Sequence, residues 1–359
     1  MTSVYICRAI PIDQDSRVQR YREILLSAGH NVKVIQWGGA PGSDLVVSPL
    51  PRIRGNRFVN LFLTPLFSIW LFFYLVIKCD KDYLVVAVDL DTALPTFLAS
   101  AVKKFKYIFD IADPFSLCRL NRRVKVIDRL EGFIARRARL AIIPAECRRV
   151  FYSQSIDFCV IENVPSVMDL GTRTSHFKSD RLQVGYFGNL EPDHRGLELL
   201  ISIVLGRDDI TLHVGGTGGL TEKFLLEAEE NPRKIKFYGR FSPKELPALA
   251  SECDLMFAFY SLTKEHHKYV AANKLYEHLL LGLPVLTNEG TNFATDILSW
   301  QSGWAVSENA EALNSFFEFI SINESIVSEK SVLARELWEQ NYKNYWANSS
   351  AVKKFLKLF

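Results

Sequence analysis

One segment of the chain, which begins at Asn273, combines residue types that could hold a nucleotide diphosphate. It runs Asn-Lys-Leu-Tyr-Glu-His-Leu-Leu-Leu-Gly-Leu-Pro-Val, and the spacing predicts a helix that Asn273 caps, Gly282 ends and Pro284 prevents from resuming. Amides at a helix start attract phosphate, and Lys274 adds positive charge there. Glu277, one turn further, could accept hydrogen bonds from both hydroxyls of a ribose. An ordinary capped amphipathic helix explains the same spacing, so the pattern alone leaves both interpretations open.

The segment resembles the donor-binding signature of the retaining glycosyltransferases of family 4, in which Lys-Leu-x-Glu is followed by Gly-x-Pro-Val. Glu277, Gly282 and Pro284 stand at that signature's spacing. The fuller family pattern has another glutamate eight residues before Glu277, where this chain has Tyr269. The resemblance implies that the donor is a nucleotide-diphosphate sugar, contacted here by Asn273, Lys274, Leu275 and Glu277.

Two basic residues are candidates to stabilise a diphosphate as it leaves the sugar. Positive charge must be aimed at the diphosphate oxygens as the sugar–oxygen bond breaks, and without a metal the protein has to supply it. Arg195 stands where family members have Lys or Arg before a glycine, and Lys274 stands at the predicted helix start. The missing side chain of Gly188 would let backbone amides approach phosphate. Either cation alone could be an ordinary surface residue, and it is the resemblance that predicts a catalytic role for both.

Glycine-rich turns and a basic–aromatic pair extend the candidate donor site. The run Gly-Gly-Thr-Gly-Gly from Gly215 lacks the Lys-Ser/Thr of a P-loop, so we interpret it as a turn lining the nucleotide. Arg240 and Phe241 stand where family members hold the base. The complete set of predicted donor-binding residues is Gly188, Asn189, Arg195, Gly215, Gly216, Arg240, Phe241, Asn273, Lys274, Leu275 and Glu277.

The acceptor side is marked mainly by Asp113. Family members tend to have Asp-x-His-Glu here, whereas this chain keeps Asp110, has Ala112 in place of the histidine and has Asp113 in place of the glutamate. In retaining relatives the departing phosphate is thought to take the acceptor's proton, so no protein base is required. We therefore predict that Asp113 orients the acceptor. A strand-end carboxylate that caps a local turn is an equal alternative. Residues 265–267, Glu-His-His, could reach the sugar or only solvate a loop.

The Asp-x-Asp sequence formed by Asp89 and Asp91 resembles a metal site, but we expect none. These residues end a predicted strand before a helix, where one carboxylate often serves only as an N-cap. Family 4 chains commonly carry a similar Asp-x-Asp-Thr without a metal. We therefore predict no metal, and no cofactor besides the donor, which is a substrate.

The length of the chain and its alternating patterns predict two α/β domains. A chain of 359 residues is too long for one ordinary core. Alternating strand and helix patterns imply parallel sheets with helices on both faces. The resemblance implies the GT-B fold, in which two Rossmann-like, doubly wound domains face each other across a cleft. We expect an acceptor-binding domain over 1–168, a linker around 166–180, a nucleotide-sugar-binding domain over 180–335, and a C-terminal helix over 336–359 that crosses back to the first domain.

Charge is unevenly distributed along the chain. Residues 1–170 contain 23 Lys and Arg against 16 Asp and Glu, whereas residues 171–359 contain 20 against 24. Much of the basic excess lies in 119–149, where apolar residues recur at helical spacing. Such a helix could lie on an anionic bilayer or present an ordinary solvated face. The arginines are not interleaved with aromatic residues, so we expect no nucleic-acid partner.

Residues 58–77 contain no charge over 20 positions, which is long enough for a transmembrane helix. Pro65 interrupts this segment, polar residues fall within it, and a strand pattern follows at once from Tyr83. We therefore expect a buried or membrane-dipping helix in preference to a span. The N-terminus runs directly into a strand pattern, from which we expect no signal peptide and a cytoplasmic protein with reduced cysteines.

These observations predict a hexosyltransferase-type glycosyltransferase. The expected reaction moves a sugar from a UDP or GDP donor to a glycan or lipid-linked oligosaccharide acceptor, with retention and without a metal. The basic first half suggests peripheral association with the inner face of the plasma membrane, as in surface-polysaccharide assembly. Two alternatives stay open: a UDP-sugar epimerase of the same fold, and a non-catalytic scaffold that only binds a nucleotide sugar.

Overall fold

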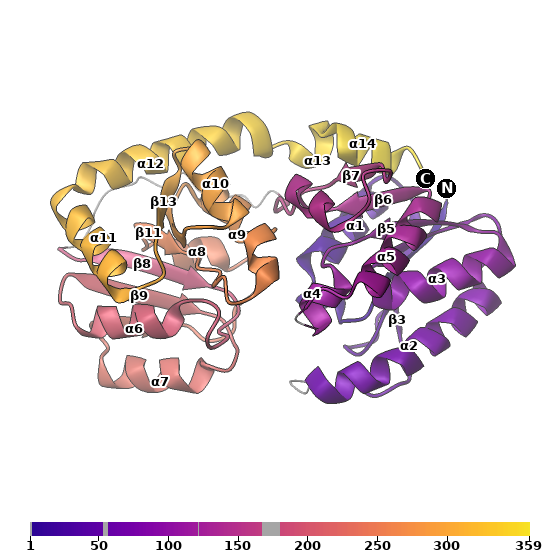
Figure 1. Cartoon of the computed structure of the whole chain (residues 1–359), viewed down its shortest axis with the longest axis horizontal. Helices are drawn as coiled ribbons and strands as arrows, with labels where there is room; N and C mark the ends of the chain where they lie inside the picture. Colours follow the sequence, from indigo (N-terminus) through magenta and orange to yellow (C-terminus); the bar gives the residue numbers. More distant parts are fainter. Residues whose placement is uncertain (1, 53–56, 121, 167–179) are drawn as a thin grey trace. The chain divides into compact units, whose positions relative to one another are not determined.

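The computed structural model describes residues 2–52, 57–120, 122–166 and 180–359, so most of the predicted linker lies outside the described residues. The chain divides into two compact units (Figure 1). Unit 1 contains Met1–Ser166 together with Trp346–Phe359, and unit 2 contains Val167–Tyr345. Each unit is built around its own sheet and is described by itself.

The described part of unit 1 contains a seven-stranded parallel sheet in the order β3-β2-β1-β4-β5-β6-β7. The chain winds outward from β1 in one direction and then returns to add β4 on its other side. The loops that follow the carboxyl ends of β1 and β4 therefore lead away in opposite directions. Ligands of doubly wound folds bind at such a switch point. The strands are β1 (Ser3–Arg8), β2 (Asn31–Gln36), β3 (Leu45–Val47), β4 (Tyr83–Val88), β5 (Lys106–Asp110), β6 (Leu140–Ile143) and β7 (Phe158–Val160).

Helices cover both faces of this sheet. On one face, α2 packs on α3, and α3 packs on α5 (Figure 1). On the other face, Asp15 caps α1 by accepting hydrogen bonds from the amides of Arg17 and Val18. The helices are α1 (Ser16–Ser27), α2 (Arg57–Lys78), α3 (Leu90–Lys103), α4 (Phe115–Leu120) and α5 (Lys125–Arg137), with short 3-10 turns η1 (Ile12–Gln14) and η2 (Glu146–Phe151).

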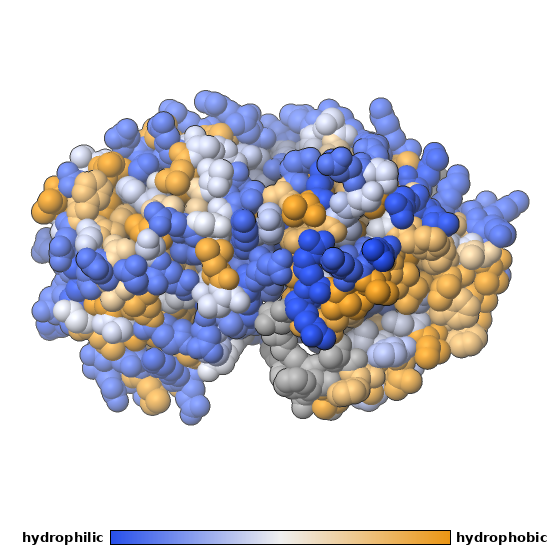
Figure 2. All heavy atoms as spheres, viewed as in Figure 1, coloured by the Kyte–Doolittle hydropathy of each residue, from blue (hydrophilic) through white to orange (hydrophobic). Residues whose placement is uncertain are grey.

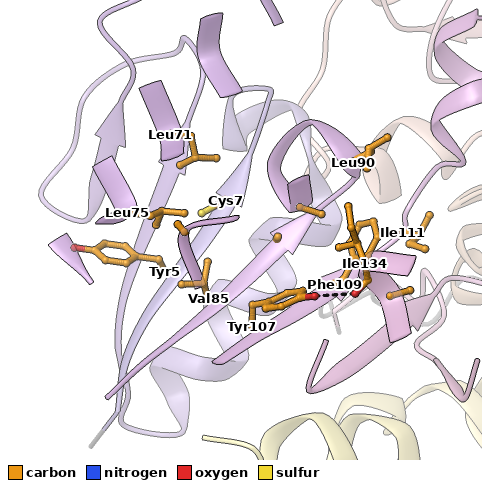
Figure 3. Close-up of a cluster of buried hydrophobic side chains, with 14 of the residues drawn as sticks. Tyr5, Cys7, Leu71, Leu75, Val85, Leu90, Tyr107, Phe109, Ile111 and Ile134 are labelled. Atoms are coloured by element: carbon orange, nitrogen blue, oxygen red, sulfur yellow. Dashed lines mark hydrogen bonds between the residues drawn. The ribbon is translucent and has the colours of Figure 1, made fainter. Parts of the chain in front are cut away.

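The core of unit 1 joins the sheet to α2 and α5. Figure 3 shows Leu71 and Leu75 of α2 near Tyr5, Cys7 and Val85 of the central strands. At the other end of the cluster, the Tyr107 hydroxyl donates to the Ile134 carbonyl of α5 at 2.7 Å (Figure 3). Strands buried on both faces need continuous apolar runs, which explains sequences such as Tyr-Leu-Val-Val-Ala-Val in β4.

Helix α2 contains the uncharged segment 58–77. One side of the helix, with Phe67, Leu71 and Leu75, is fully buried against the sheet. The Phe67 ring stacks on Trp37, which directly follows β2, with centroids 5.3 Å apart. Within the described residues, no helix combines the length and the apolar character needed to cross a bilayer. The expectation of a packed helix is therefore confirmed for this side of α2.

The C-terminal residues of the chain pack on α1 of unit 1. Phe355 stacks on Tyr21 with ring centroids 5.1 Å apart, and the Trp346 indole donates to the Val164 carbonyl at 3.1 Å. This segment forms α13 (Tyr345–Asn348) and α14 (Ser350–Leu356). Burying these large aromatic groups fixes the end of the chain to unit 1.

Unit 2 is a six-stranded parallel sheet in the order β10-β9-β8-β11-β12-β13 among the described residues. Its switch point lies between β8 and β11. The strands are β8 (Leu182–Phe187), β9 (Ile210–Gly215), β10 (Ile235–Phe237), β11 (Leu255–Phe257), β12 (Val285–Asn288) and β13 (Gly303–Val306). The helices are α6 (Leu197–Leu205), α7 (Thr221–Glu230), α8 (Leu246–Ala250), α9 (Lys274–Leu281), α10 (Asn292–Ser299), α11 (Ala310–Ile322) and α12 (Glu324–Leu337), with a 3-10 turn η3 (Glu265–Tyr269) and a π turn η4 (Trp338–Tyr342).

Candidate functional site

The predicted donor residues gather at the carboxyl edge of the unit 2 sheet, around its switch point. The loop that carries Gly188, Asn189 and Arg195 follows β8, and the segment that leads to Lys274 follows β11. Because β8 and β11 are hydrogen-bonded neighbours, their two following loops leave the sheet side by side. Gly188 and Lys274, which are 86 positions apart in the sequence, are thus brought to one place.

Lys274 lies directly against Gly188. A β-carbon on Gly188 would collide with the Lys274 ammonium nitrogen, and the φ of +148° at Gly188 is rare for any residue with a side chain. The same ammonium lies 4.7 Å from the centroid of the Tyr186 ring, in a cation–π contact. The Tyr186 hydroxyl in turn donates to the Asn189 carbonyl at 2.6 Å, which fixes the start of the loop. The Lys274 side chain and the loop that follows β8 therefore pack directly against each other.

The start of α9 differs from the prediction in one respect. Asn273 stands at the N-cap position, as predicted, but it has helical dihedral angles and its side chain makes no capping hydrogen bond. The reason is that the turn begins earlier: the Leu275 amide already donates to Ala272, and the Glu277 amide donates to Asn273. The Leu275 side chain is buried and belongs to the core. Because the amides from Leu275 onward are already paired, the positive group at this helix end is the Lys274 ammonium.

The end of α9 is as predicted. Gly282 adopts the left-handed conformation with φ +62°, and its amide closes the helix. Two residues of α12 then satisfy the terminal carbonyls: Arg335 donates to Leu280 at 2.8 Å, and Ser331 donates to Gly282. A cation at this position also complements the helix dipole. These bonds anchor α9 and so fix where Lys274 stands.

Burial and the neighbouring Glu277 carboxylate act in opposite directions on the pKa of Lys274. Burial lowers the pKa of Lys274 to about 8, because a desolvated ammonium is disfavoured, while the nearby Glu277 carboxylate opposes that shift and Arg195 adds to it. Glu277 is one turn along the same helix and half-buried. The lysine therefore titrates near the pH of the cell, where an anionic ligand would favour its charged form.

The Arg195 guanidinium contacts the ring of Tyr260, and one of its hydrogen-bond donors has no partner among the described residues. Its guanidinium carbon lies 4.8 Å from the centroid of the Tyr260 ring. Its Nε is buried without a hydrogen-bond partner among the described residues. Gly196 follows with φ +63° and backs onto Phe259, which forces the chain to turn at this point. A buried donor left unpaired is unfavourable, so an incoming acceptor group would relieve it.

The position of Tyr260 is fixed by Asn288, at the end of β12. The Asn288 side chain accepts from the Tyr260 amide at 2.6 Å and donates to the Tyr260 carbonyl at 3.0 Å. Burial raises the pKa of the Tyr260 hydroxyl, so the ring under Arg195 stays neutral. Sequence analysis missed Tyr186, Tyr260 and Asn288. The two tyrosines lie in or directly after apolar strand runs and are indistinguishable there from core residues, and no local signal marks the asparagine.

Two histidines near Arg195, the buried His267 and the half-buried His194, form an aromatic cluster with Tyr260. The His267 imidazole bonds to the Ser261 carbonyl at 2.8 Å, and its ring lies 6.3 Å from that of His194 and 5.8 Å from that of Tyr260. Burial lowers the pKa of His267 to about 3, so it is neutral at physiological pH. The sequence left open whether His267 reaches the sugar or only solvates a loop. In the structure it is buried and packs in the aromatic cluster beside Arg195.

The glycine-rich turn after β9 meets the loop after β8. A β-carbon on Gly216 would overlap the Gly188 carbonyl, and the Gly188 amide donates to Gly215 at 2.9 Å. The Leu190 amide donates to the Thr217 carbonyl at 3.1 Å. Gly215 and Gly216 therefore support the β8 loop by close backbone contact, consistent with the predicted turn.

Arg240 and Phe241 lie farther along the same sheet edge, after β10. Arg240 is exposed, and the Phe241 ring packs edge-on against Phe187 at 5.9 Å. Phe241 also lies against Gly215, where a β-carbon would be 3.0 Å from its ring. The pair therefore borders the β8 and β9 loops, at the side of the switch point away from Lys274.

Asp113 lies in unit 1 and is the most exposed of its candidate residues. Its side chain is 54 % exposed and lies 3.4 Å from Arg148, while its amide donates to Asp89 at 3.0 Å. Asp89 is held by Arg8, which is also paired with Asp15 at 2.6 Å. This network spans the switch point between β1 and β4. It holds Asp113 in place through its backbone and leaves its carboxylate open to solvent.

Asp110 and Asp91, the other two aspartates near Asp113, are paired with arginines. Arg17 binds Asp110 through two nitrogens, at 2.6 and 2.9 Å, and Arg119 pairs with Asp91 at 2.8 Å. Asp89 stands at the N-cap position of α3, but its side chain accepts from Arg8 and from the Asp113 amide and makes no capping hydrogen bond. Across the described residues, no three acidic, histidine or cysteine side chains are grouped to hold a metal ion.

Solved structures of other proteins share this architecture. No family model and no curated protein matches the sequence, but solved structures match over the full length. A sucrose-phosphate synthase from Thermosynechococcus elongatus superposes with a TM-score of 0.72 at 13% identity, covering 100% of this chain and 98% of that one. The chain has the GT-B fold. This confirms the fold class predicted from the sequence.

Two further GT-B structures are similar over nearly their whole length. Anabaena HepE, in complex with UDP and glucose, matches with a TM-score of 0.68 at 14% identity, covering 100% of this chain and 99% of that one. WaaG, a glycosyltransferase involved in lipopolysaccharide biosynthesis, matches with a TM-score of 0.63 at 15% identity, covering 97% and 98%. The predicted similarity to GT-B glycosyltransferases is thus confirmed at the level of structure.

Proposed function

We propose that this protein is a glycosyltransferase that moves a sugar from a nucleotide-diphosphate donor to a glycan or lipid-linked acceptor. UDP or GDP is the expected nucleotide, and the acceptor is expected to belong to a surface polysaccharide assembled at the inner face of the plasma membrane. HepE is described with UDP and with UDP-glucose, which supports a nucleotide-sugar donor for a chain of the same fold.

The observation that carries this proposal is the placing of Lys274 and Arg195 at one switch point. Both cations lie beside tyrosine rings, next to a glycine loop that leaves the backbone bare. Anions bind where positive groups converge on exposed backbone at the carboxyl ends of parallel strands. The Nε of Arg195 is buried and burial lowers the pKa of Lys274, and a partly desolvated cation attracts a phosphate more strongly.

In the proposed reaction the bond between the anomeric carbon and the β-phosphate oxygen breaks. Lys274 and Arg195 stabilise the negative charge that develops on that oxygen. The acceptor hydroxyl forms the new bond on the same face of the sugar, and its proton passes to the departing phosphate. Glu277 holds the ribose hydroxyls, and Asp113 orients the acceptor. The arginine pairing of Asp89 and Asp91 favours a reaction without a metal at those carboxylates.

The direct test measures release of free nucleotide from UDP-, GDP- and ADP-sugars in the presence of a lipid-linked acceptor. We expect release that depends on the acceptor, with one nucleotide preferred. Formation of an isomerised sugar without acceptor would indicate an epimerase instead. Binding without turnover on any acceptor would indicate a scaffold.

Replacing Glu277 with glutamine tests the ribose contact. A carboxylate that accepts two hydrogen bonds contributes enough for us to expect affinity for the free nucleoside diphosphate to fall roughly 10- to 100-fold. Isothermal titration calorimetry with the preferred nucleotide measures this. Glu222→Gln, on the exposed side of α7, is a matched control that should bind normally. Wild-type affinity in Glu277→Gln would remove the assignment of this residue.

The pH dependence of transfer should report Lys274. Its ammonium form binds the diphosphate, and its pKa is lowered to about 8. We therefore expect kcat/KM to be constant below that pH and to fall tenfold per pH unit above it. Because Glu277 raises the pKa of Lys274, the Glu277→Gln variant should move this limb to lower pH. A profile that is flat up to pH 10 would contradict the assignment.

A further inference from the structure

The outer side of α2 carries an apolar stripe that the core does not use. Phe62, Leu66, Ile69, Phe73 and Ile77 recur at intervals of three and four residues, so they lie along one side of the helix. Their exposure ranges from 49% for Leu66 to 80% for Phe62. They are distinct from the buried side formed by Phe67, Leu71 and Leu75. A helix that faced only water would place polar residues here.

Helix α3 continues this surface. It packs beside α2, and its outer residues Leu98 and Val102 are 46% and 59% exposed. Figure 2 shows apolar surface gathered over this part of unit 1, with strongly hydrophilic side chains beside it. Contiguous exposed apolar surface of this kind marks an interaction site, unlike single exposed apolar residues.

The charges around the apolar stripe are almost all positive. Lys78 follows Ile77 at the end of α2, and Lys103 and Lys104 follow Val102 at the end of α3. On the other side, α5 packs against α3 through Phe133 and Phe97, whose ring centroids are 5.7 Å apart. The Arg137 guanidinium lies 3.6 Å from the Phe133 ring centroid, and Arg129 is one turn before Phe133 on the same side of α5.

The carboxylates of these three helices are withdrawn from the surface. Helix α2 has none among its residues, Asp91 of α3 and Glu131 of α5 are buried, and the Asp128 side chain is only 10% exposed beside Arg123. The exposed acids nearest to α2 along the chain, Asp80 and Asp82, lie in the turn that follows it. Among the described residues of these helices, the exposed charged groups beside the apolar stripe are therefore cations.

We infer that the outer surface of α2 and α3, with the flanking cations of α5, docks on an anionic phospholipid bilayer. Aromatic and aliphatic side chains enter the boundary between headgroups and acyl chains, while lysine and arginine bind the anionic headgroups. A second copy of the chain fits less well, because a symmetric interface would bring the same cations against one another. The surface is thus matched to a partner that is both apolar and negative.

The test is co-sedimentation of the full-length protein with vesicles of phosphatidylglycerol and phosphatidylcholine, compared with phosphatidylcholine alone. We expect binding only to the anionic vesicles, weakened by salt. Ile77→Glu should lower the vesicle affinity roughly tenfold or more, since an apolar contact is lost and a like charge is added. Ile322→Glu is the matched control, because Ile322 is 81% exposed on α11 of unit 2, and it should bind as wild type does.

Neutralising Arg129 and Arg137 together tests the charged part of the surface. Each cation near an anionic membrane strengthens binding roughly fivefold, so we expect a loss of roughly 25-fold in the double alanine variant. Absence of wild-type binding to anionic vesicles would overturn the inference, as would equal losses in Ile77→Glu and Ile322→Glu. A wild-type dimer in analytical ultracentrifugation that Ile77→Glu dissociates would assign the surface to a second copy. No nucleotide sugar enters these measurements, so their outcome is independent of the proposed transfer reaction.

Discussion

Replacing Lys274 with methionine is expected to lower kcat/KM for sugar transfer by roughly 100- to 1000-fold, the effect typical of losing one group that stabilises transition-state charge. The ammonium lies against Gly188, where a β-carbon would collide with it, and in the proposed reaction it faces the diphosphate. Methionine has a similar volume and keeps the contact with Tyr186, but it brings no charge. The loss should appear in kcat as well as in KM, because charge on the leaving oxygen grows as the bond breaks.

The stability of the Lys274→Met variant separates loss of charge from misfolding. The folded state binds the lysine proton less tightly than the unfolded state does, so the buried ammonium opposes folding at neutral pH. Between pH 8 and the normal lysine pKa, wild-type stability should therefore rise as pH increases. Methionine removes the opposing charge, and we expect a Tm equal to or above that of wild type at pH 7.

A matched control is Lys223→Met, on the exposed surface of α7. Transfer and Tm should both stay near wild-type values in this variant. Steady-state kinetics of nucleotide release and thermal unfolding followed by circular dichroism measure the two quantities. Full activity in Lys274→Met, or inactivity accompanied by a large fall in Tm, would contradict the role assigned to the ammonium.

Much of the fold could be predicted because its signals are local. Gly282 and Pro284 end α9 through their own backbone preferences, and the Gly282 conformation is as expected. The alternation of strands and helices is also a local pattern, and it gave the two parallel sheets. The start of α9 was less predictable, because Asn273 caps a helix only if the preceding residue stays outside it, and here Ala272 already accepts a hydrogen bond.

The site was only partly predictable because its contacts are not local. Lys274 meets Gly188 only because β11 pairs with β8, and this pairing follows from sheet order. Tyr186 and Tyr260 support the two cations, yet in sequence they resemble the apolar residues around them. Similarly, the uncharged stretch in α2 could not show that one side is buried and the other exposed, since both sides are apolar.

The second prediction with a large expected effect concerns Arg195, the cation that the sequence identified from its neighbouring glycine. Replacing it with alanine should lower kcat/KM roughly 100-fold or more, because it removes a charged donor from the diphosphate. Its Nε is buried without a partner among the described residues, so the free protein gains nothing from that donor. The variant should consequently keep its Tm, whereas Arg233→Ala, an exposed arginine of the same unit, should keep both activity and Tm.

Lysine at position 195 distinguishes charge from geometry. The guanidinium carbon lies 4.8 Å from the Tyr260 ring centroid, and a lysine has neither the planar face nor the fork of donors of an arginine. We therefore expect Arg195→Lys to recover nucleotide affinity in part while kcat stays low. Recovery of wild-type kcat by lysine would show that positive charge alone is needed. In that case the stacking on Tyr260, and the support that Asn288 gives to it, would have no part in positioning the leaving group.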